Sequence, residues 1–160
     1  MLCKPNGSKI SAAGWEHSTL RRLLNGDFQR RAFTGRERKR IFRPGSENEG
    51  FPGAGESVND VSDPVFCLSA AETERYFGSA DGRRCLPTAF AMRDGCGSQY
   101  DKESRYCWWW LRNGGRDASS KVPEPCHAAV VDPDGNIDYD GFSVSQRRIS
   151  VRPAIRVILN

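Results

Sequence analysis

Cysteine and histidine are the residue types of this sequence most able to do chemistry, either as metal ligands or as nucleophiles. The six cysteines stand at positions 3, 67, 85, 96, 107 and 126, and the two histidines are His17 and His127. No Cys-x-x-Cys pair is present, and neither histidine has the spacing of a zinc ligand. The sequence therefore predicts no metal and no cofactor. Without a secretory signal, reduced thiols are favoured, with Cys67 and Cys107 buried in apolar runs.

Sequence patterns typical of enzymes are also absent. The chain contains neither the nucleophile-elbow pattern G-x-S-x-G nor the phosphate-loop pattern G-x-x-x-x-G-K-[ST]. An oxidase of the formylglycine-generating or iron-dependent kind would need a reactive cysteine pair or several histidines. Cys96 and Cys126 are the pair that could meet in space, which the sequence alone does not show. We therefore expect a non-catalytic protein and keep the oxidase as an alternative.

Positive charge is concentrated in one segment of the chain. The formal net charge is +4, and residues 29–43 carry seven Arg or Lys residues against one Glu. Such a patch can contact phosphates, so nucleic-acid binding through residues 30–43 is a second hypothesis. A charge run of this kind is also typical of a solvated helix face.

Acidic residues alternate in a second segment. Asp132, Asp134, Asn136 and Asp138 resemble the start of a calcium loop, but no glutamate stands at the twelfth position. The alternative is a turn, Asp132-Pro-Asp-Gly135, between two strands, and the residue types favour it.

A tryptophan-rich strand must organise the core that positions any site. In a strand over Tyr106–Arg112, Trp108 and Trp110 would face one way and Trp109 the other, because side chains alternate. Three such side chains need cover on both faces, which predicts a central strand. Arg112 ends the run, and a buried guanidinium needs carboxylate or carbonyl acceptors, so we expect a structural role for it.

The first half of the chain reads as helical. Apolar spacing predicts a helix over 18–31, and capping-box patterns predict helices starting at Thr34 and Ser69, with a stop at Gly78. A further short helix is expected at 87–92. Long loops are expected at 44–63 and 113–126.

Short antiparallel strands dominate the second half. A strand is predicted at 64–68, a hairpin at 127–139, and a final strand at 149–159 in which Pro153 demands an edge or a bulge. The predicted fold class is α+β, with helices in the first half and strands in the second. No apolar run is long enough to span a membrane.

Seven motifs in order resemble an uncharacterised domain family of gut bacteria and their phages, whose signature is WWLR followed by VRPA. They are Trp15-x-x-Ser18-Thr-Leu-Arg with Leu24-Asn25-x-x-Phe28, Ala32-Phe33-Thr34, Val65-Phe66-x-Leu68-Ser69, Arg84-Cys85-x-Pro87-Thr88-Ala89, Trp108-Trp-Trp-Leu-Arg112, Ala129-x-Val131-x-x-Asp134-Gly135 and Val151-Arg152-Pro153-Ala154. That family is similar to C-type-lectin-fold domains of the formylglycine-generating-enzyme type. Some members resemble the variable proteins of diversity-generating retroelements, which display rewritten loops on a fixed scaffold.

This resemblance implies a single C-type-lectin-like domain over residues 1–160, lacking the first strands that relatives show before residue 3. It implies that Trp108, Trp109, Trp110, Arg112, Arg152 and Pro153 form the scaffold. The loops between them would bind a protein or glycan ligand. Their residue types suit adaptable contacts, and the predicted binding residues are Asn113, Arg116, Asp117, Tyr139, Asp140, Phe142, Ser145 and Gln146.

The location of the protein depends on the true start of the chain. The residues after Met1 contain no apolar segment of a secretory signal. A cytoplasmic protein is expected if Met1 is the native start. If a segment precedes it, a cell surface or a phage particle is expected.

Overall fold

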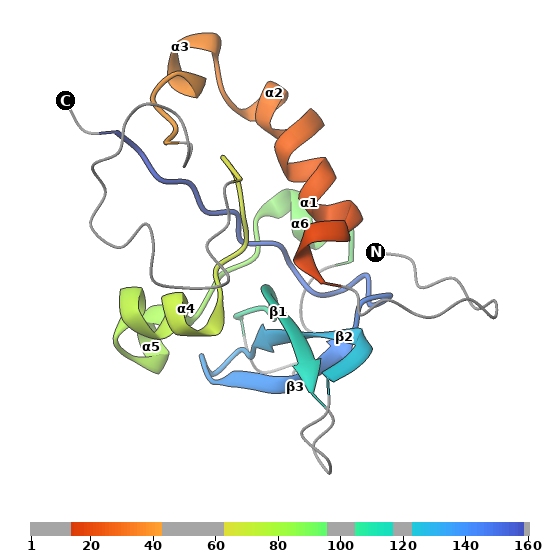
Figure 1. Ribbon diagram of the computed structural model, residues 1–160. Coiled ribbons are helices and arrows are strands. Elements are labelled where there is room, and N and C mark those ends of the chain that lie inside the picture. Colours follow the sequence, from red (N-terminus) through yellow and green to blue (C-terminus); the bar gives the residue numbers. More distant parts are fainter. Residues whose placement is uncertain (1–13, 43–62, 96–104, 117–122, 159–160) are drawn as a thin grey trace, which may run out of the picture. The chain divides into compact units, whose positions relative to one another are not determined.

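The computed structural model describes residues 14–42, 63–95, 105–116 and 123–158 (Figure 1). The chain divides into two compact units. The sheet unit comprises Met1–Thr19 and Cys67–Arg152, and the helix unit comprises Leu20–Phe66 and Pro153–Asn160.

One helix opens the helix unit, as the sequence predicts for residues 18–31. It runs through α1 (Thr19–Leu23), a π-helical turn η2 (Leu24–Phe28) and α2 (Gln29–Ala32). The next helix, α3 (Gly35–Arg38), begins at the predicted capping box: the Glu37 amide donates to the Thr34 hydroxyl, and the Thr34 amide donates to the Glu37 carboxylate at 2.7 Å. Both helix predictions are confirmed.

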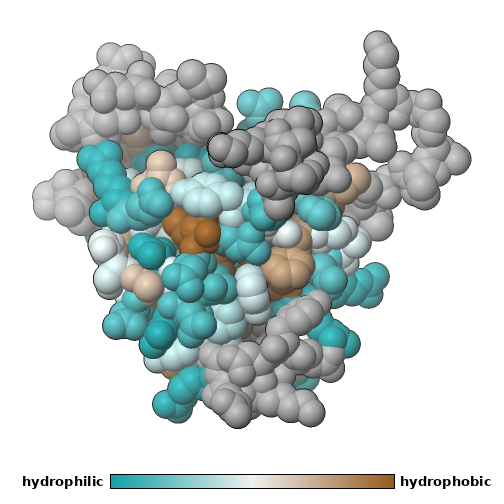
Figure 2. Space-filling view, turned by 90° about the horizontal axis from the view of Figure 1, so that it is seen from below, coloured by the Kyte–Doolittle hydropathy of each residue, from teal (hydrophilic) through white to brown (hydrophobic). Residues whose placement is uncertain are grey.

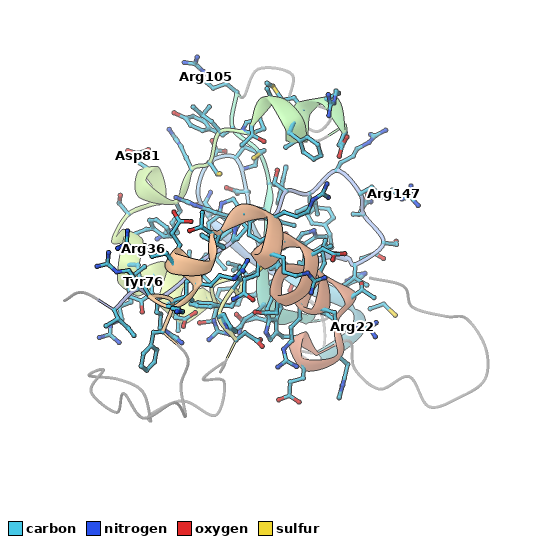
Figure 3. The ribbon with its side chains drawn as sticks, turned by 90° about the horizontal axis from the view of Figure 1, so that it is seen from above. Arg22, Arg36, Tyr76, Asp81, Arg105 and Arg147 are labelled. Carbon is cyan, nitrogen blue, oxygen red and sulfur yellow. The ribbon has the colours of Figure 1, made fainter. Side chains whose placement is uncertain are left out.

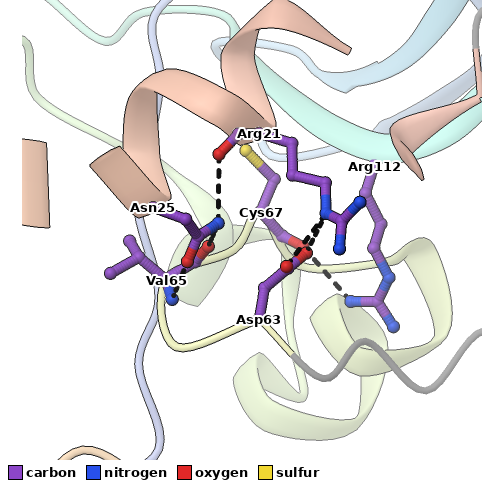
Figure 4. A network of polar contacts seen from close by, with 6 residues as sticks. All are labelled: Arg21, Asn25, Asp63, Val65, Cys67 and Arg112. Carbon is purple, nitrogen blue, oxygen red and sulfur yellow. Dashed lines mark hydrogen bonds and ion pairs between the residues drawn. The ribbon is translucent and has the colours of Figure 1, made fainter. Parts of the chain in front are cut away.

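An ion pair and side-chain hydrogen bonds connect this helix to the segment around residue 65 (Figure 4). Arg21 forms an ion pair with Asp63 at 2.7 Å. The Asn25 side chain donates to the carbonyl of Val65 at 2.8 Å and accepts from the Val65 amide at 3.0 Å. One amide side chain thus replaces a strand partner for this main-chain segment.

The predicted strands at 64–68 and 149–159 are extended segments rather than regular strands. In the helix unit they meet at isolated bridges, Phe66 with Ala154 and Ile41 with Val157. Pro64 and Pro153 have no amide hydrogen, so a continuous ladder cannot pass through them. At Pro153 the structure therefore has neither an edge strand nor a bulge in a ladder, because the segment makes only isolated bridges.

The sheet unit contains a three-stranded antiparallel sheet in the order β1-β2-β3. Its strands are β1 (Trp109–Arg116), β2 (Pro123–Val131) and β3 (Ile137–Ser143). The mixed α+β class is confirmed. The tryptophan strand β1 is not central, however, because β2 pairs with both neighbours. The outer edge of β1 is met by single bonds instead: the Trp110 amide donates to Ser150 and the Arg112 amide to Leu68, both at 3.0 Å.

Apolar side chains cover both faces of this sheet, as the alternation in the tryptophan run predicts. On one face Trp109 and Leu111 pack with Ala129, Val131 and Ala70. On the other, the buried cluster with Trp108 and Phe142 packed against it consists of Trp110, Ala128, Val130, Val144 and Ile149. Neighbouring tryptophans therefore belong to different clusters.

Short helices complete the sheet unit: η1 (Trp15–His17), α4 (Ala70–Phe77), α5 (Ala80–Arg83) and α6 (Ala89–Arg93). α4 begins at the predicted capping box of Ser69 and Glu72 and ends at Gly78, whose φ is +59°. These predictions are confirmed. α6 begins two residues later than expected, because Thr88 is its N-cap and the Thr88 hydroxyl accepts from the Ala91 amide at 3.1 Å.

The predicted loop at 113–126 is shorter than expected, since β1 continues to Arg116 and β2 starts at Pro123. Gly114 and Gly115 indicate a loop by composition, yet Gly115 is buried in β1. A Cβ there would overlap the Asp140 carbonyl oxygen and crowd the His127 side chain, so glycine permits a close approach of strands. Most of the other predicted loop, 44–63, lies outside the described residues.

The cysteines divide into free and bonded residues. Cys67 and Cys107 are buried, as predicted, and neither they nor Cys85 are disulfide-bonded. Cys126 is disulfide-bonded, so the expectation of reduced thiols is wrong at that position. Cys96, its expected neighbour, lies outside the described residues.

Candidate functional site

A bulge in β3 carries two of the predicted binding residues, Tyr139 and Asp140. Ala128 pairs with Phe142 and Val130 with Asp138, so residues 139–141 lie opposite the single residue Ala129. The Asp138 carboxylate holds this bulge by accepting from the amides of Asp140 at 3.0 Å and Gly141 at 3.1 Å. Both Tyr139 and Asp140 are exposed as a result.

Tyr139 places a partly exposed aromatic side chain at this bulge. The residue is 40% exposed, and its hydroxyl donates to the Glu74 carboxylate on α4 at 3.2 Å. The hydroxyl contact orients the ring while leaving part of its face open to solvent. Tyrosine in such a position supplies contact area at low entropic cost.

Ser145 and Gln146 form a turn directly after β3. The Ser145 hydroxyl lies 2.9 Å from that of Ser143, and the Gln146 amide donates to the Ser143 carbonyl at 2.9 Å. Ser143 pairs with His127, whose side chain flanks Gly115 together with Asp140. The end of β1, the bulge and this turn are therefore neighbours.

We call this set of residues the bulge face: Tyr139, Asp140, Ser145, Gln146 and the main chain at Arg116. Of the other predicted binding residues, the Arg116 side chain and Asp117 lie outside the described residues. Asn113 accepts a hydrogen bond from the Ala70 amide at 2.8 Å, at the start of α4. Phe142 packs edge-to-face on Trp108, with ring centres 5.0 Å apart. Asn113 and Phe142 thus make contacts within the sheet unit.

Arg152, in the motif Val151-Arg152-Pro153-Ala154, contacts Trp109 in the tryptophan motif. Its guanidinium lies over the rings of Phe77, at 4.4 Å, and Trp109, at 5.1 Å. It also donates to the Arg83 carbonyl oxygen at 3.3 Å, which accepts from the Trp109 indole at 3.0 Å as well. These contacts agree with a scaffold role for Trp109 and Arg152. Pro153 follows as the first residue of this segment in the helix unit.

Arg112 lies in a second buried polar network. Its guanidinium forms an ion pair with Glu72. It also donates to the Cys67 carbonyl at 3.2 Å, as Figure 4 shows. The Glu72 carboxylate also accepts from the Ser69 amide at 2.8 Å. The Glu72 carboxylate thus caps α4 and also neutralises the charge of Arg112. A carboxylate and a carbonyl are the acceptors that the sequence predicts for Arg112.

Sequence reasoning missed Glu74 and Asp138, which contact the bulge face, and Cys85, which packs against the buried cluster around Trp109. Asp138 carried a signal, because an Asp two residues before another Asp and three before a Gly is typical of a side chain that accepts from turn amides. Glu74 and Cys85 carried none, since their partners are distant in sequence.

Of the alternating residues at 132–138, Asp132 and Asn136 stabilise the hairpin turn, whereas Asp138 holds the β3 bulge. Asp132 accepts from the Asn136 amide at 2.8 Å, and the Gly135 amide donates to the Asp132 carbonyl at 3.0 Å. Within the ranges that the structure describes, no three His, Cys, Asp or Glu residues gather as metal ligands would. The turn interpretation explains these side chains.

Hydrophilic side chains dominate the face of the molecule in Figure 2, with a few apolar side chains between them. No helix in the described part of the chain combines the length and the apolar character needed to cross a membrane. The most exposed large apolar side chains are Leu23, Tyr76, Leu86, Phe90 and Met92.

Comparison with known proteins gives one result. No curated protein and no solved structure matches the chain significantly. A family model described as a domain of unknown function (DUF6273) matches residues 4–159. Since this match covers nearly the whole sequence, the chain belongs to the DUF6273 family.

Proposed function

We propose that this domain is a non-catalytic ligand-binding or display domain and that the bulge face is its binding surface. The observation that carries the proposal is the β3 bulge, which exposes Tyr139 and Asp140 at one end of a sheet packed on both faces. A rigid support beneath an exposed aromatic ring and a carboxylate favours specific binding, because little order is lost on association.

The motif resemblance extends this proposal to a C-type-lectin-like fold and to the variable protein of a diversity-generating retroelement. On this reading, the buried tryptophans and Arg152 are the constant scaffold, and the residues of the bulge face vary. Sequencing the DNA around the gene tests this extension of the proposal. We expect a reverse-transcriptase gene and an adenine-biased near-copy of the segment that encodes residues 108–152. A locus with neither feature contradicts the retroelement reading and leaves a fixed binding domain.

Binding at the bulge face is tested with the protein on glycan and protein arrays. For any ligand found, Tyr139→Ala and Asp140→Asn are each expected to weaken binding about tenfold or more, as residues at the centre of an interface do. Tyr76→Ala is the matched control, because Tyr76 is an exposed tyrosine on α4 outside the bulge face. Equal losses in all three variants, or a loss at Tyr76 alone, would contradict the proposal.

Nucleic-acid binding by the helix unit is the second candidate, favoured by exposed cations on α2 and α3. The side chains of Arg30, Arg31, Arg36, Lys39 and Arg40 are exposed, and Arg36 is labelled in Figure 3. The nearby acids are already engaged: Asp27 pairs with Arg30, and Glu37 accepts from Thr34. Hydrogen bonds from Thr34 lower the pKa of Glu37, so it stays ionised within the capping box.

A salt titration tests this second candidate. Affinity for duplex DNA should fall steeply with salt, with a slope of about −0.9 per phosphate contacted. Reversing the charge at Arg31, Arg36 and Arg40 together should abolish binding, whereas Arg75→Glu on α4 should leave most of it. Arg38 is kept, because it donates to the Phe33 carbonyl at 2.9 Å and supports the local fold. Binding that is weak at all salt concentrations would exclude this function.

A further inference from the structure

Two cysteines of the sheet unit that are not disulfide-bonded, Cys85 and Cys107, lie side by side, although they are 22 positions apart in the chain. The Cys107 amide donates to the Cys85 carbonyl at 2.8 Å, and the Cys107 thiol approaches the same oxygen at 3.3 Å. These two contacts bring the main chains of the cysteines and the Cys107 sulfur close together, and a disulfide between two cysteines requires such a close approach.

The two thiols differ in exposure. Cys107 is 2% exposed, and the Ser150 hydroxyl lies 3.3 Å from its sulfur. Cys85 is partly exposed and packs at the edge of the cluster around Trp109. A reagent from solvent therefore reaches Cys85 first, while Cys107 is positioned behind it.

The surroundings of Cys85 favour its thiolate. The hydrogen bond from Cys107 lowers the pKa of Cys85 to about 6; partial burial raises this pKa, and the positive charge of Arg152 lowers it. Cys67 in the same unit shows the opposite case, because burial raises its pKa to about 12 despite the charge of Arg112. A thiolate is the nucleophilic form of cysteine, so these two residues should differ widely in reactivity.

We propose that Cys85 and Cys107 form a thiol–disulfide exchange site for small disulfides, with Cys85 as the attacking and Cys107 as the resolving thiol. The Cys85 thiolate attacks one sulfur of the disulfide RSSR, whose S–S bond breaks and releases RS⁻. Cys107 then attacks the Cys85 sulfur, which expels the second RS⁻, and the leaving thiolates take up protons. Two protein thiols are oxidised and one disulfide is reduced to two thiols. The reaction is stoichiometric and independent of ligand binding at the bulge face.

Oxidised glutathione, followed by peptide mass spectrometry without reductant, tests this site in the full chain. The wild-type protein should yield the Cys85–Cys107 cross-link, and Cys107→Ser should accumulate glutathione on Cys85. In Cys85→Ser, glutathione should be added to Cys107 about tenfold or more slowly than to Cys85 in Cys107→Ser, because the Cys107 thiol is buried. Cys67→Ser is the matched control and should form the cross-link at the wild-type rate. Mapping at peptide level keeps the disulfide of Cys126 separate.

Two outcomes would overturn the proposal. One is stable glutathione on wild-type Cys85 with no internal cross-link, which would show that Cys107 does not resolve it. The other is modification of Cys67 as fast as Cys85, which would show that the site is not selective. Both are read from the wild-type protein, so they hold even if a variant fails to fold.

Discussion

The guanidinium of Arg152 lies 5.1 Å from the centre of the Trp109 ring, which joins the late VRPA motif to the tryptophan strand. The same guanidinium lies 4.4 Å from the centre of the Phe77 ring. A planar guanidinium can stack on aromatic rings and still donate at its edge, as Arg152 does to the Arg83 carbonyl. Trp109 is completely buried, so this contact lies within the core.

Replacing Arg152 by lysine should therefore destabilise the protein although the charge is kept. The ammonium group cannot stack on the rings, and we expect a loss of about 1 to 2 kcal/mol in the free energy of unfolding. Denaturant titration followed by tryptophan fluorescence measures it. Arg147→Lys is the control, since Arg147 is exposed (Figure 3), and an equal effect of the two substitutions would contradict a specific role for Arg152.

Removing Arg112 should cost more, because it leaves the mostly buried Glu72 carboxylate without its cation. The side chains of Arg112 and Glu72 are 6% and 15% exposed. Arg112→Met should lower the free energy of unfolding by about 3 kcal/mol, as breaking a buried pair does. Thermal unfolding with the double variant Arg112→Met, Glu72→Gln completes the test. If the effects of the two substitutions simply add, the pair is not coupled.

Thermal unfolding of a variant that lacks an exposed ion pair gives the reference value for the buried pair. Asp81 pairs with Arg84 at 3.1 Å, and its side chain is 83% exposed. Asp81→Asn should change the free energy of unfolding by less than about 1 kcal/mol, because solvent screens the pair.

Substituting Gly141 should disrupt the bulge. Its φ is +66°, and an alanine Cβ would overlap the carbonyl oxygen of Ala128. Gly141→Ala is expected to cost about 1 to 3 kcal/mol of folding stability. Gly114→Ala is the control within β1, because no atom lies within 4 Å of a Cβ there. Chemical denaturation of both variants decides it, and equal stabilities would remove the structural basis of the bulge face.

The reactivity of Cys85 should depend on pH near neutrality. Raising the pH through its pKa of about 6 converts the thiol to thiolate, so alkylation by iodoacetamide should speed up there and then level off. Cys107→Ala removes the hydrogen bond that lowers this pKa most, so the midpoint should move up toward about 8.5. Cys67, with its pKa of about 12, should stay unreactive over this range. An unchanged midpoint in Cys107→Ala would contradict the pairing of the thiols.

Local signals in the sequence predicted the helices and the hairpin correctly. The capping boxes at Thr34 and Ser69, the stop at Gly78 and the Asp132 to Gly135 turn each depend on neighbouring residues, so their chemistry can be read without a fold. The alternation of Trp109 and Trp110 was equally local.

Predictions that depended on distant partners fared less well. The tryptophan strand has the residues of a central strand, but among the described residues its outer edge makes only isolated main-chain hydrogen bonds, with Ser150 and Leu68. Composition indicated a loop at Gly115, whereas the strand needs glycine there for a close approach. Within the candidate site, the exposure of Tyr139 was predictable in part from its hairpin. The contacts of Asn113 with α4 and of Phe142 with Trp108 were not, because they depend on tertiary packing.

The Arg83 carbonyl oxygen, which accepts from both Trp109 and Arg152, belongs to the main chain. No substitution of the side chain at position 83 removes that oxygen, so both hydrogen bonds can persist when residue 83 changes during evolution. The Arg83 side chain is in turn occupied elsewhere, donating to the Gly135 carbonyl at 2.6 Å. The two donors can be lost by mutation, but their shared acceptor is lost only if the backbone itself moves.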